Sequence, residues 1–368
     1  MQTYIVGGAV RDALLGLPVN DRDWVVVGAT PQQLIAAGYL PVGKDFPVFL
    51  HPQTREEYAL ARTERKTAAG YHGFVFHAEP TVTLEDDLAR RDLTINAMAQ
   101  DASGRIVDPH GGQADLKARV MRHVTAAFRE DPVRILRVAR FMARFDDFTL
   151  APETLALMRE MVGAGEVDAL VAERVWQEIA RGLMEANPAR MIDVLRQCGA
   201  LQRLLPELDA MWDAPLAAVL DTSARVDAPL PVRFACLVYR LQDDMRTICE
   251  RLRVPVECRE LAEVVAREWA QVQASTTMDA AAVLHLLERC DAFRKPQRFE
   301  QVLLTCECIA GSHAQSGRLM RALAAAQAVS TADIASRAQA SGVKGPGVGE
   351  MIHDARVDAV ARALQSPG

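Results

Sequence analysis

Two short motifs near the start of the chain carry the residue types that a metal-bound nucleotide requires. Gly7 and Gly8 follow a short apolar run and precede a helical pattern that includes Arg11. A glycine turn leading into a helix N-terminus offers backbone N–H groups to phosphate, and arginine adds a forked cation. Asp21 and Asp23 precede a second apolar run, and on a strand they would share one face, roughly 6–7 Å apart. Two carboxylates beside a phosphate cradle suit a Mg²⁺-nucleotide.

A second motif joins two arginines to an aspartate and an asparagine. Helical period over 91–99 predicts that Arg90 and Arg91 lie at the start of a helix, where they can reach a triphosphate or a ribose hydroxyl. Asp92 would cap this helix and Asn96 would fix its turn. The alternative is a solvated basic patch. The position of the motif after the glycines and the aspartate pair favours nucleotide binding.

A third motif is a polar stripe on a helix predicted over 132–145. Asp131 and the proline after it form a typical helix start. Asp131, Arg134, Arg137 and Arg140 recur at every third position, so each step falls about 60° short of a full turn and the stripe winds slowly around the helix. The alternative interpretation is an exposed face of arginines with an acidic cap.

This stripe also predicts a way to select bases. A carboxylate beside a guanidinium offers a hydrogen-bond acceptor next to a donor, as Asp131 and Arg134 would. Cytosine and adenine each show an amino donor beside a ring-nitrogen acceptor, whereas uracil and guanine show the opposite order. One Asp–Arg pair can therefore accept C and A and reject U and G. Each wrong base would leave buried polar groups unpaired, at a cost of about 1–3 kcal/mol per group.

Glu57 is a candidate third carboxylate. It lies in a predicted strand over 56–61, where it could share a face with the Asp21 and Asp23 pair. A glutamate at the edge of a strand is more typically solvated, and the sequence leaves both interpretations open.

The elements that must position these residues change character near residue 120. Before it, short apolar runs alternate with turn residues, which is typical of a mixed α/β region. After it, nearly every segment has helical period. The predicted strands are 3–7, 23–28, 46–50, 56–61 and 105–108, and the predicted helices of this first part are 10–16, 31–37 and 91–99. The predicted helices of the second part include 132–145, 153–162, 173–186, 188–198, 231–241, 244–252 and 256–271, with a last one over 350–364 after a glycine-rich loop at 342–349.

Composition bounds the class of protein. The 368 residues are enough for two to three domains, and a net charge of −6 argues mildly against nucleic acid as a partner, although arginines cluster locally. Seven cysteines lack metal-ligand spacing and predict packed free thiols in a reducing compartment. No apolar run reaches the roughly 18 residues of a membrane span, and the first predicted strand begins too early for a leader peptide. We expect a cytoplasmic protein.

In combination, the motifs resemble those of one enzyme family. They are Gly-Gly-Ala-Val-Arg-Asp at 7–12, Asp-Arg-Asp at 21–23, Arg-Arg-Asp-Leu-Thr-Ile-Asn-Ala at 90–97 and Glu-Asp-Pro-Val-Arg-Ile-Leu-Arg at 130–137. In this order and spacing the chain resembles the class II tRNA nucleotidyltransferases, the bacterial CCA-adding enzymes of the polymerase-β-like superfamily. The resemblance implies an α+β fold: a polymerase-β-like nucleotidyltransferase head over 1–120, an all-α neck with the base template over 121–210, and an all-α body and tail that contact tRNA over 211–368.

The resemblance also implies residue roles. Catalytic metal ligands would be Asp21 and Asp23, with Mg²⁺ as the cofactor. The nucleotide contacts would be Gly8, Arg11, Arg91, Arg137 and Arg140, and the base-reading pair would be Asp131 and Arg134. The implied activity is template-independent addition of C, C and A to the 3′ end of tRNA from CTP and ATP, with release of pyrophosphate. The implied partner is the tRNA acceptor arm. The oligomeric state is not determined by the sequence, and a monomer is the expectation.

The chain departs from one branch of this family. Many proteobacterial relatives carry an HD phosphohydrolase domain after the neck, which needs clustered His and Asp ligands. Here no histidine lies between His123 and His285, and Tyr239-Arg240 stands where a His-Asp pair is expected. The sequence therefore predicts that the hydrolase segment is deleted and that no phosphohydrolase activity is present.

Three alternatives remain open at this point. An A-adding or CC-adding specialist would differ in the segment 64–83, which the sequence alone does not interpret. A bacterial poly(A) polymerase shares the motifs but tends to carry extensions and a basic tail. A non-catalytic tRNA-binding protein on a decayed scaffold is disfavoured because Asp21, Asp23 and Arg91 are intact.

Overall fold

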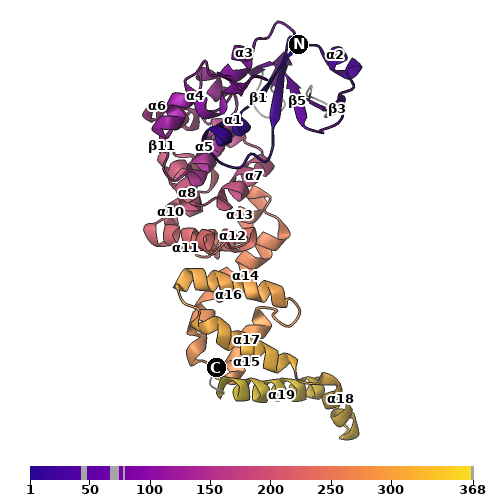
Figure 1. The fold of residues 1–368 in the computed structure, drawn as a ribbon. Coiled ribbons are helices and arrows are strands. Elements are labelled where there is room, and N and C mark those ends of the chain that lie inside the picture. Colours follow the sequence, from indigo (N-terminus) through magenta and orange to yellow (C-terminus); the bar gives the residue numbers. More distant parts are fainter. Residues whose placement is uncertain (43–47, 67–73, 78, 366–368) are drawn as a thin grey trace. The chain divides into compact units, whose positions relative to one another are not determined.

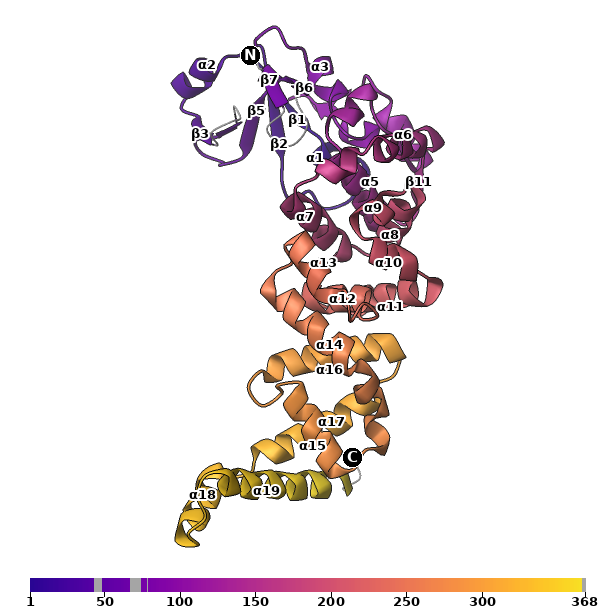
Figure 2. The same ribbon diagram turned by 180° about the vertical axis from the view of Figure 1, so that it is seen from behind.

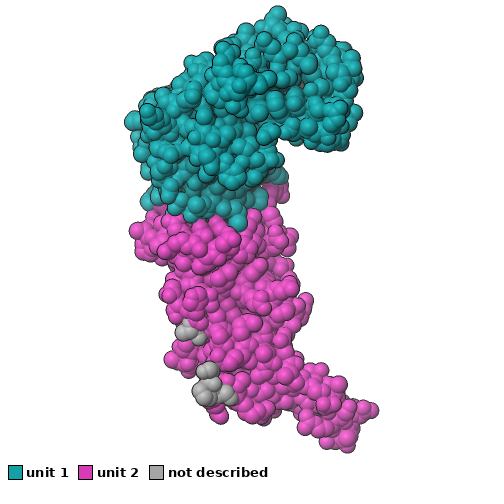
Figure 3. Space-filling view, in the orientation of Figure 1, with its two compact units in different colours: residues 1–206 teal, residues 207–368 magenta. Residues whose placement is uncertain are grey.

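The computed structural model describes residues 1–42, 48–66, 74–77 and 79–365 (Figure 1). The chain divides into two compact units, Met1–Pro206 (unit 1) and Glu207–Gly368 (unit 2), which Figure 3 colours separately. Unit 1 combines a sheet with helices, and the described elements of unit 2 are all helices. This agrees with the predicted mixed head followed by an all-helical region.

Unit 1 is built on a seven-stranded sheet in the order β3-β4-β5-β2-β1-β8-β9 (Figure 2). Its strands are β1 (Gln2–Val6), β2 (Asp23–Val27), β3 (Leu40–Val42), β4 (Val48–Leu50), β5 (Glu57–Leu60), β8 (Ala99–Gln100) and β9 (Ile106–Val107). The β2–β5 pair is parallel, and the other pairs are antiparallel. A separate antiparallel ribbon consists of β6 (Thr63–Lys66) and β7 (Phe74–His77).

Alternation along β2 gives the sheet two apolar faces. Val25 packs in one buried cluster with Leu88 of α3 (Leu84–Ala89), and Val26 packs in a second cluster with Leu34 of α2 (Pro31–Ala36). Successive side chains of a strand point to opposite faces, so neighbouring valines can serve both clusters. The sheet is thereby covered on both sides and presents the ends of its strands for function.

The predicted helix over 91–99 is wrong. The helix in this region is α3, which ends at Ala89, and the segment after it contains a short 3₁₀ turn at Thr94–Asn96 and then β8. The reason lies in the hydrogen bonds of this segment. The carboxylate of Asp92 accepts the Leu93 N–H at 2.8 Å, and the Thr94 N–H bonds to the Arg122 carbonyl at 2.9 Å. These partners replace the i→i−4 bonds of an α-helix.

The helices of unit 1 after residue 120 confirm the predicted periodicity. They include α5 (Val133–Arg144), α6 (Pro152–Gly163), α7 (Ala172–Leu183) and α8 (Pro188–Gln197). Figures 1 and 2 show α5 beside α7 and α8, and it contacts both. Ile135, Val138 and Ala139 of α5 are fully buried there. The apolar sides of α5 therefore fix its rotation, and its polar stripe is directed elsewhere.

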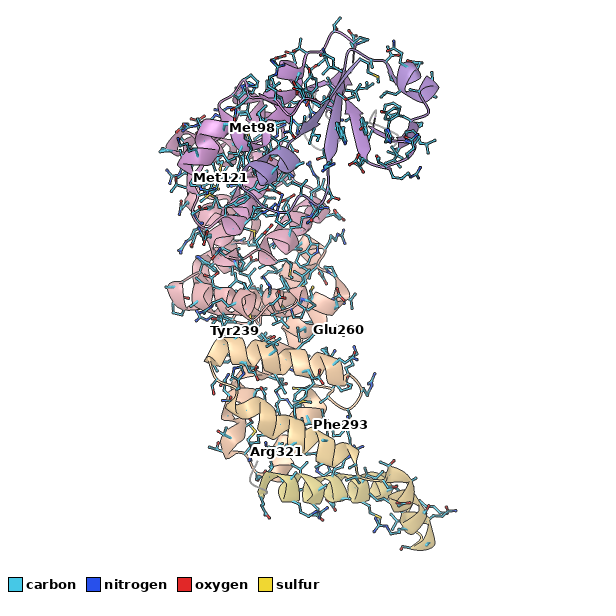
Figure 4. The ribbon with its side chains drawn as sticks, viewed as in Figure 1. Met98, Met121, Tyr239, Glu260, Phe293 and Arg321 are labelled. Atoms are coloured by element: carbon cyan, nitrogen blue, oxygen red, sulfur yellow. The ribbon has the colours of Figure 1, made fainter. Side chains whose placement is uncertain are left out.

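In the first part of unit 2, α12 (Leu230–Val238) contacts α14 (Val256–Ala274) and α16 (Pro296–Ala310). The other α-helices of this unit are α10 (Pro206–Met211), α11 (Ala214–Arg225), α13 (Met245–Leu252), α15 (Ala280–Arg289), α17 (Ala314–Gln327), α18 (Thr331–Ala340) and α19 (Pro346–Gln365). In its last part, α19 contacts α15, α17 and α18. Figure 4 labels Tyr239 in this unit. Its ring meets that of Trp269 edge to face, with centroids 5.4 Å apart.

Two further expectations concern the cysteines and the last helix. All seven cysteines of the chain are free and buried, which confirms the prediction of packed thiols. The last helix begins at Pro346, inside the predicted loop 342–349, because proline is well suited to the first turn of a helix. None of the helices within the described ranges is long and apolar enough to cross a membrane.

Candidate active site

A cavity of about 630 Å³ in unit 1 (the main cavity) brings together all nine residues that the sequence singled out for nucleotide, metal and base contacts. Its lining residues are Gly7, Gly8, Arg11, Asp21, Asp23, Arg90, Arg91, Asp92, Asn96, Asp131, Arg134, Arg137, Arg140, Phe141, Arg144 and Arg174. They come from the sheet, from the segment after α3 and from α5 and α7. The tertiary structure thus joins segments more than 100 residues apart in one concave surface.

The glycine pair permits a close approach at the floor of the main cavity. Gly7 precedes α1 (Gly8–Leu14) with φ 71° and ψ −132°, a conformation that favours glycine. A Cβ atom at Gly7 would lie 3.0 Å from Nη1 of Arg91. The Gly7 N–H donates to the carbonyl of Met98, which is labelled in Figure 4, at 3.2 Å. Both the backbone conformation and the neighbouring guanidinium therefore require glycine here.

Asp21 and Asp23 lie at the same wall of the main cavity, although they do not share a strand. Asp23 is the first residue of β2, and Asp21 lies in the loop before it, so the expected strand alternation does not apply to the pair. Both residues are exposed, and neither side chain has a hydrogen bond or ion pair with a described residue. Two unneutralised carboxylates in a mainly cationic cavity fit a hard divalent cation, which prefers oxygen ligands.

Glu57 is placed next to Asp23 by the sheet. The parallel pairing of β2 with β5 sets Asp23 opposite Glu57, and strands so paired lie about 4.8 Å apart. Glu57 does not line the main cavity. It lines a smaller cavity of about 290 Å³ (the side cavity), which shares Asp23, Arg90 and Arg91 with the main one. Its role as a third carboxylate stays a prediction.

Arg11 is held rigidly at the edge of the main cavity. Its side chain is buried, with Nε donating to Asp12 at 2.8 Å and Nη1 donating to Asn96 at 2.6 Å. The guanidinium also lies over the rings of Phe141 and Phe145, 5.1 and 5.3 Å from their centroids. Burial lowers the pKa of Arg11 from its ordinary value, but an arginine remains a cation at neutral pH.

Asp92 joins the head segment to the helix α5. Its Oδ1 accepts Nδ2 of Asn96 at 3.0 Å, and its Oδ2 accepts Nε of Arg137 at 2.8 Å. Burial alone would raise the pKa of Asp92, but the charge and hydrogen bond of Arg137, together with Asn96, lower it to about 2. The chain Arg11–Asn96–Asp92–Arg137 therefore fixes two cavity cations through one ionised carboxylate.

A second buried carboxylate supports the arginines of α5 from behind. Glu178 of α7 accepts Nε of Arg140 at 2.6 Å, and its other oxygen lies 4.0 Å from Nη1 of Arg137. Arg140 also stacks over Phe141, 4.6 Å from the ring centroid. The spacing of Arg137 and Arg140 on one helix face makes both reachable from one side chain of the neighbouring helix.

The proposed base-reading residues are both present at the cavity, but their partners differ from expectation. The carboxylate of Asp131 accepts the Val133 N–H at 3.1 Å and Nη2 of Arg174 at 2.7 Å. The helix α5 begins one residue later than predicted, at Val133, so Pro132 and not Asp131 is its N-cap. Arg134 is buried and donates from Nη1 to the carbonyl of Ala127 at 2.7 Å. Asp131 is therefore paired with an arginine from α7, a residue that the sequence analysis missed.

The charges at the main cavity are arranged asymmetrically. Eight arginines and four aspartates line it, and further carboxylates that pair with these arginines, such as Asp12, Asp87 and Glu178, lie behind the lining. The surface that a ligand meets is therefore mainly cationic, apart from the Asp21 and Asp23 wall. This arrangement suits a polyanion that brings its own divalent cation.

The sequence analysis missed Asp87, Arg144, Arg174 and Glu178. Asp87 pairs with Arg90 and Arg91 at the local spacings i+3 and i+4. The shortest ion pairs of Arg144, Arg174 and Glu178 join residues far apart in the sequence, so no local spacing marks these three. Arg144 pairs with Asp12 at 3.0 Å across 132 positions, and Arg174 pairs with Asp131 across 43. For Arg144 the available signal was helical phase, because it continues the polar side of α5 one turn beyond Arg140.

Two segments of the chain match known protein families. Residues 3–122 match the family described as the poly A polymerase head domain, and residues 147–211 match the family described as a probable RNA and SrmB-binding site of polymerase A. The two matched regions both lie almost wholly in unit 1.

Two relatives that align over nearly the whole of both chains carry the same name. The "Multifunctional CCA protein" of Paracidovorax citrulli is 60% identical over 415 aligned positions, covering 100% of this chain and 99% of that protein. The protein of the same name from Acidovorax sp. is 57% identical over 412 positions, covering 100% of this chain and 97% of that protein. That alignment exceeds the 368 residues of this chain by 44 positions, which are gaps in this chain.

Solved structures show the same fold. The Bacillus stearothermophilus CCA-adding enzyme in complex with CTP superposes with a TM-score of 0.73 at 26% identity, covering 98% of this chain and 88% of that one. The Thermotoga maritima CCA-adding enzyme complexed with tRNA superposes with a TM-score of 0.69 at 21% identity, covering 99% and 90%.

Proposed function

Because this chain belongs to the family of bacterial CCA-adding enzymes, we propose that its main cavity is the nucleotidyltransferase centre and assign roles to its residues. The protein is a tRNA nucleotidyltransferase that adds CCA to the 3′ end of tRNA. The observation that carries the assignment is the convergence of nine predicted residues on one cavity, whose lining holds eight arginines together with Asp21 and Asp23, two carboxylates without a partner among the described residues.

Asp21 and Asp23 would hold Mg²⁺. Their exposure and lack of partners among the described residues support this role, and so does the hard oxygen chemistry of carboxylates. When bound, a divalent cation would neutralise charge on the triphosphate and make the tRNA 3′-hydroxyl easier to deprotonate. Polymerase-β-like nucleotidyltransferases generally use a divalent metal, and the choice of Mg²⁺ is our proposal.

The triphosphate would lie between Gly8 and the arginines Arg11, Arg91, Arg137 and Arg140. Their guanidinium groups are held by Asp12, Asn96, Asp87, Asp92 and Glu178, so they need little reorganisation when the anion arrives. The 3′-hydroxyl of tRNA attacks the α-phosphorus of the bound CTP or ATP, and the bond to the β-phosphate oxygen breaks to release pyrophosphate. The arginines stabilise the charge that moves onto the leaving group, and the cavity supplies the in-line geometry.

Asp131 and Arg134 would select the base. Arg174 fixes the carboxylate of Asp131 from α7, which leaves its orientation set before a nucleotide binds. A fixed acceptor beside a donor matches the Watson–Crick edges of cytosine and adenine. Rejection of U and G then follows from the unpaired groups that they would leave.

Three broader assignments accompany this proposal. We assign the head to 1–120, the neck to 121–210 and the body and tail, which would hold the tRNA acceptor arm, to 211–368. We also propose a monomer in the cytoplasm, and the seven free buried cysteines support a reducing compartment. The long stretch without histidine and the 44 gap positions support the absence of a phosphohydrolase.

The decisive experiment is incubation of the purified chain with tRNA that lacks its 3′ CCA, with CTP and ATP singly and together, followed by sequencing of the products. We expect CC with CTP alone and CCA with both nucleotides. Products that stop at CC, or that gain only A on a CC-ended tRNA, would indicate a specialist. The predicted determinant of that difference, 64–83, includes 67–73 and 78, which lie outside the described residues. No incorporation at all would overturn the assignment.

A further inference from the structure

A fully buried carboxylate lies directly behind the main cavity and has no role in the reaction described above. Asp87 of α3 is 0% exposed. Its Oδ1 accepts Nε and Nη2 of Arg90 at 3.1 and 2.8 Å, and its Oδ2 accepts Nη2 of Arg91 at 3.1 Å. One carboxylate thus receives two neighbouring guanidinium groups, both of which line the main and side cavities.

The same carboxylate also reaches the sheet. The backbone N–H of Arg62 donates to Oδ1 of Asp87 at 3.3 Å. Arg62 lies between the end of β5 and the start of β6, and the Ala61 N–H beside it bonds to Val26 of β2 at 2.8 Å. Asp87 therefore connects the two cavity arginines to the strands that carry Asp23 and Glu57.

The carboxylate of Asp87 holds the two arginines in place, and the contacts of Arg91 show what its removal would change. Arg91 is anchored through Nη2 to Asp87, its Nη1 lies against Gly7, and its Nε has no hydrogen-bond partner among the described residues. Burial alone would raise the pKa of Asp87, but the charges of Arg90 and Arg91 outweigh burial and lower it. The carboxylate is thus ionised in the folded chain, and without it two adjacent guanidinium groups would repel each other.

We propose that Asp87 is a positioning residue for nucleotide binding, which orients Arg90 and Arg91 toward the triphosphate and ties them to the strands of the metal-binding wall. Asp87 touches no substrate in this arrangement and acts through the two arginines. Both nucleotides share the triphosphate, so the effect of losing Asp87 is the same for CTP and ATP and leaves base selection unchanged. This inference rests on the proposed function of the main cavity.

The test is steady-state kinetics of Asp87→Asn with CTP, ATP and tRNA varied in turn. We expect KM to rise about tenfold for both nucleotides, because a charge-assisted bond to each arginine is lost, with kcat and the KM for tRNA within about threefold of wild type. The matched control is Asp86→Asn. Asp86 is the exposed neighbour on α3 that closes the capping box with Thr83, and this variant should leave kcat and all three KM values unchanged.

The outcomes separate this inference from the proposed function. If the wild-type chain adds no nucleotide, the proposed function fails, whatever the variants do. If the wild type is active and Asp87→Asn keeps its KM for CTP and ATP, or loses tRNA binding equally, the positioning role is wrong. If circular dichroism shows that Asp87→Asn is unfolded, Asp87→Glu takes its place. That variant keeps the charge but displaces it, so a raised nucleotide KM supports the proposal and an unchanged KM overturns it.

Discussion

Both units of the protein contain a buried carboxylate between two arginines, and the two sites differ in what the arginines face. In unit 1, Glu178 supports Arg137 and Arg140, whose side chains line the main cavity. In unit 2, Glu268 of α14 is fully buried and pairs with Arg267 and Arg289 at 2.7 and 2.9 Å.

The surroundings decide what each cluster can do. The side chains of Arg267 and Arg289 are 45% and 42% exposed, and Arg267 donates a further bond to the carbonyl of Arg289 at 3.0 Å. Their charges are therefore screened by solvent. Arg140 and Arg137 are 11% and 35% exposed, and both line the main cavity beside other arginines of like charge. A buried Arg–carboxylate cluster thus indicates function only when its cations are directed into a cavity.

The largest effect on activity is expected from Asp21 and Asp23, the cavity carboxylates that no arginine neutralises. Asp21→Ala or Asp23→Ala should reduce both C and A addition by about a thousandfold or more, because charge neutralisation supplies most of the catalysis of phosphoryl transfer. Binding of tRNA should remain near wild type in a filter or mobility assay. Near-normal turnover of either variant at saturating Mg²⁺ would show that the metal is held elsewhere.

The comparison between the clusters is tested directly by Glu178→Gln and Glu268→Gln. Each substitution should lower the free energy of unfolding by about 1–3 kcal/mol, since both weaken charge-assisted bonds to arginine. Only Glu178→Gln should also raise the KM for CTP, by about tenfold. Urea unfolding and kinetics at saturating tRNA measure the two effects. An equal rise in KM for both variants would refute the distinction that we draw.

Base selection should depend on the unit 1 cavity and be separable from chemistry. Asp131→Ala and Arg134→Ala should lose discrimination against UTP and GTP by about 10- to 100-fold, because each removes one half of the donor–acceptor pair. The measurement is kcat/KM for the four nucleoside triphosphates. Wild-type rejection of UTP and GTP in either variant would place the template in other residues.

The loss of stability at low pH should depend in part on Asp92. Its pKa of about 2 in the folded chain lies below the ordinary value of 3.8, so its contribution is fully present above about pH 4 and is lost as pH falls toward 2. This contribution is about 2 kcal/mol. Urea unfolding should therefore show that Asp92→Asn has a lower free energy of unfolding than wild type at pH 6, and that this difference is smaller at pH 3. If the difference in free energy of unfolding does not change with pH, Asp92 is not held ionised by Arg137.

The smallest effect is expected in unit 2, where we predict no metal-dependent hydrolysis. The purified chain should not cleave a 2′,3′-cyclic nucleotide with Mn²⁺, Ni²⁺ or Mg²⁺ added in turn, because borderline metals favour imidazole ligands and none lies between His123 and His285. The Asp21→Ala variant is the control for activity of the main cavity. Hydrolysis that persists in that variant would reveal a site in the helical region.

Much of this architecture could be predicted from the sequence because its signals are local. Helical period identified α5, α6, α7, α8, α12, α13 and α14, and alternation identified the strands that carry Asp23 and Glu57. The spacing of the arginines after Asp131 placed Arg134, Arg137 and Arg140 on one side of α5, and all of them line the main cavity. Glycine turns and capping residues act over a few positions, so they are visible in the sequence alone.

The tertiary structure decided which groups meet. The helix expected over 91–99 is absent because Asp92 and Thr94 bond to partners that only the folded chain provides. Arg174 reaches Asp131 because α7 packs beside α5, and the Arg62 backbone reaches Asp87 because α3 lies against the sheet. The physical reason is range: propensity and periodicity act between neighbours in the chain, whereas ion pairs and buried hydrogen bonds form between residues that packing brings together.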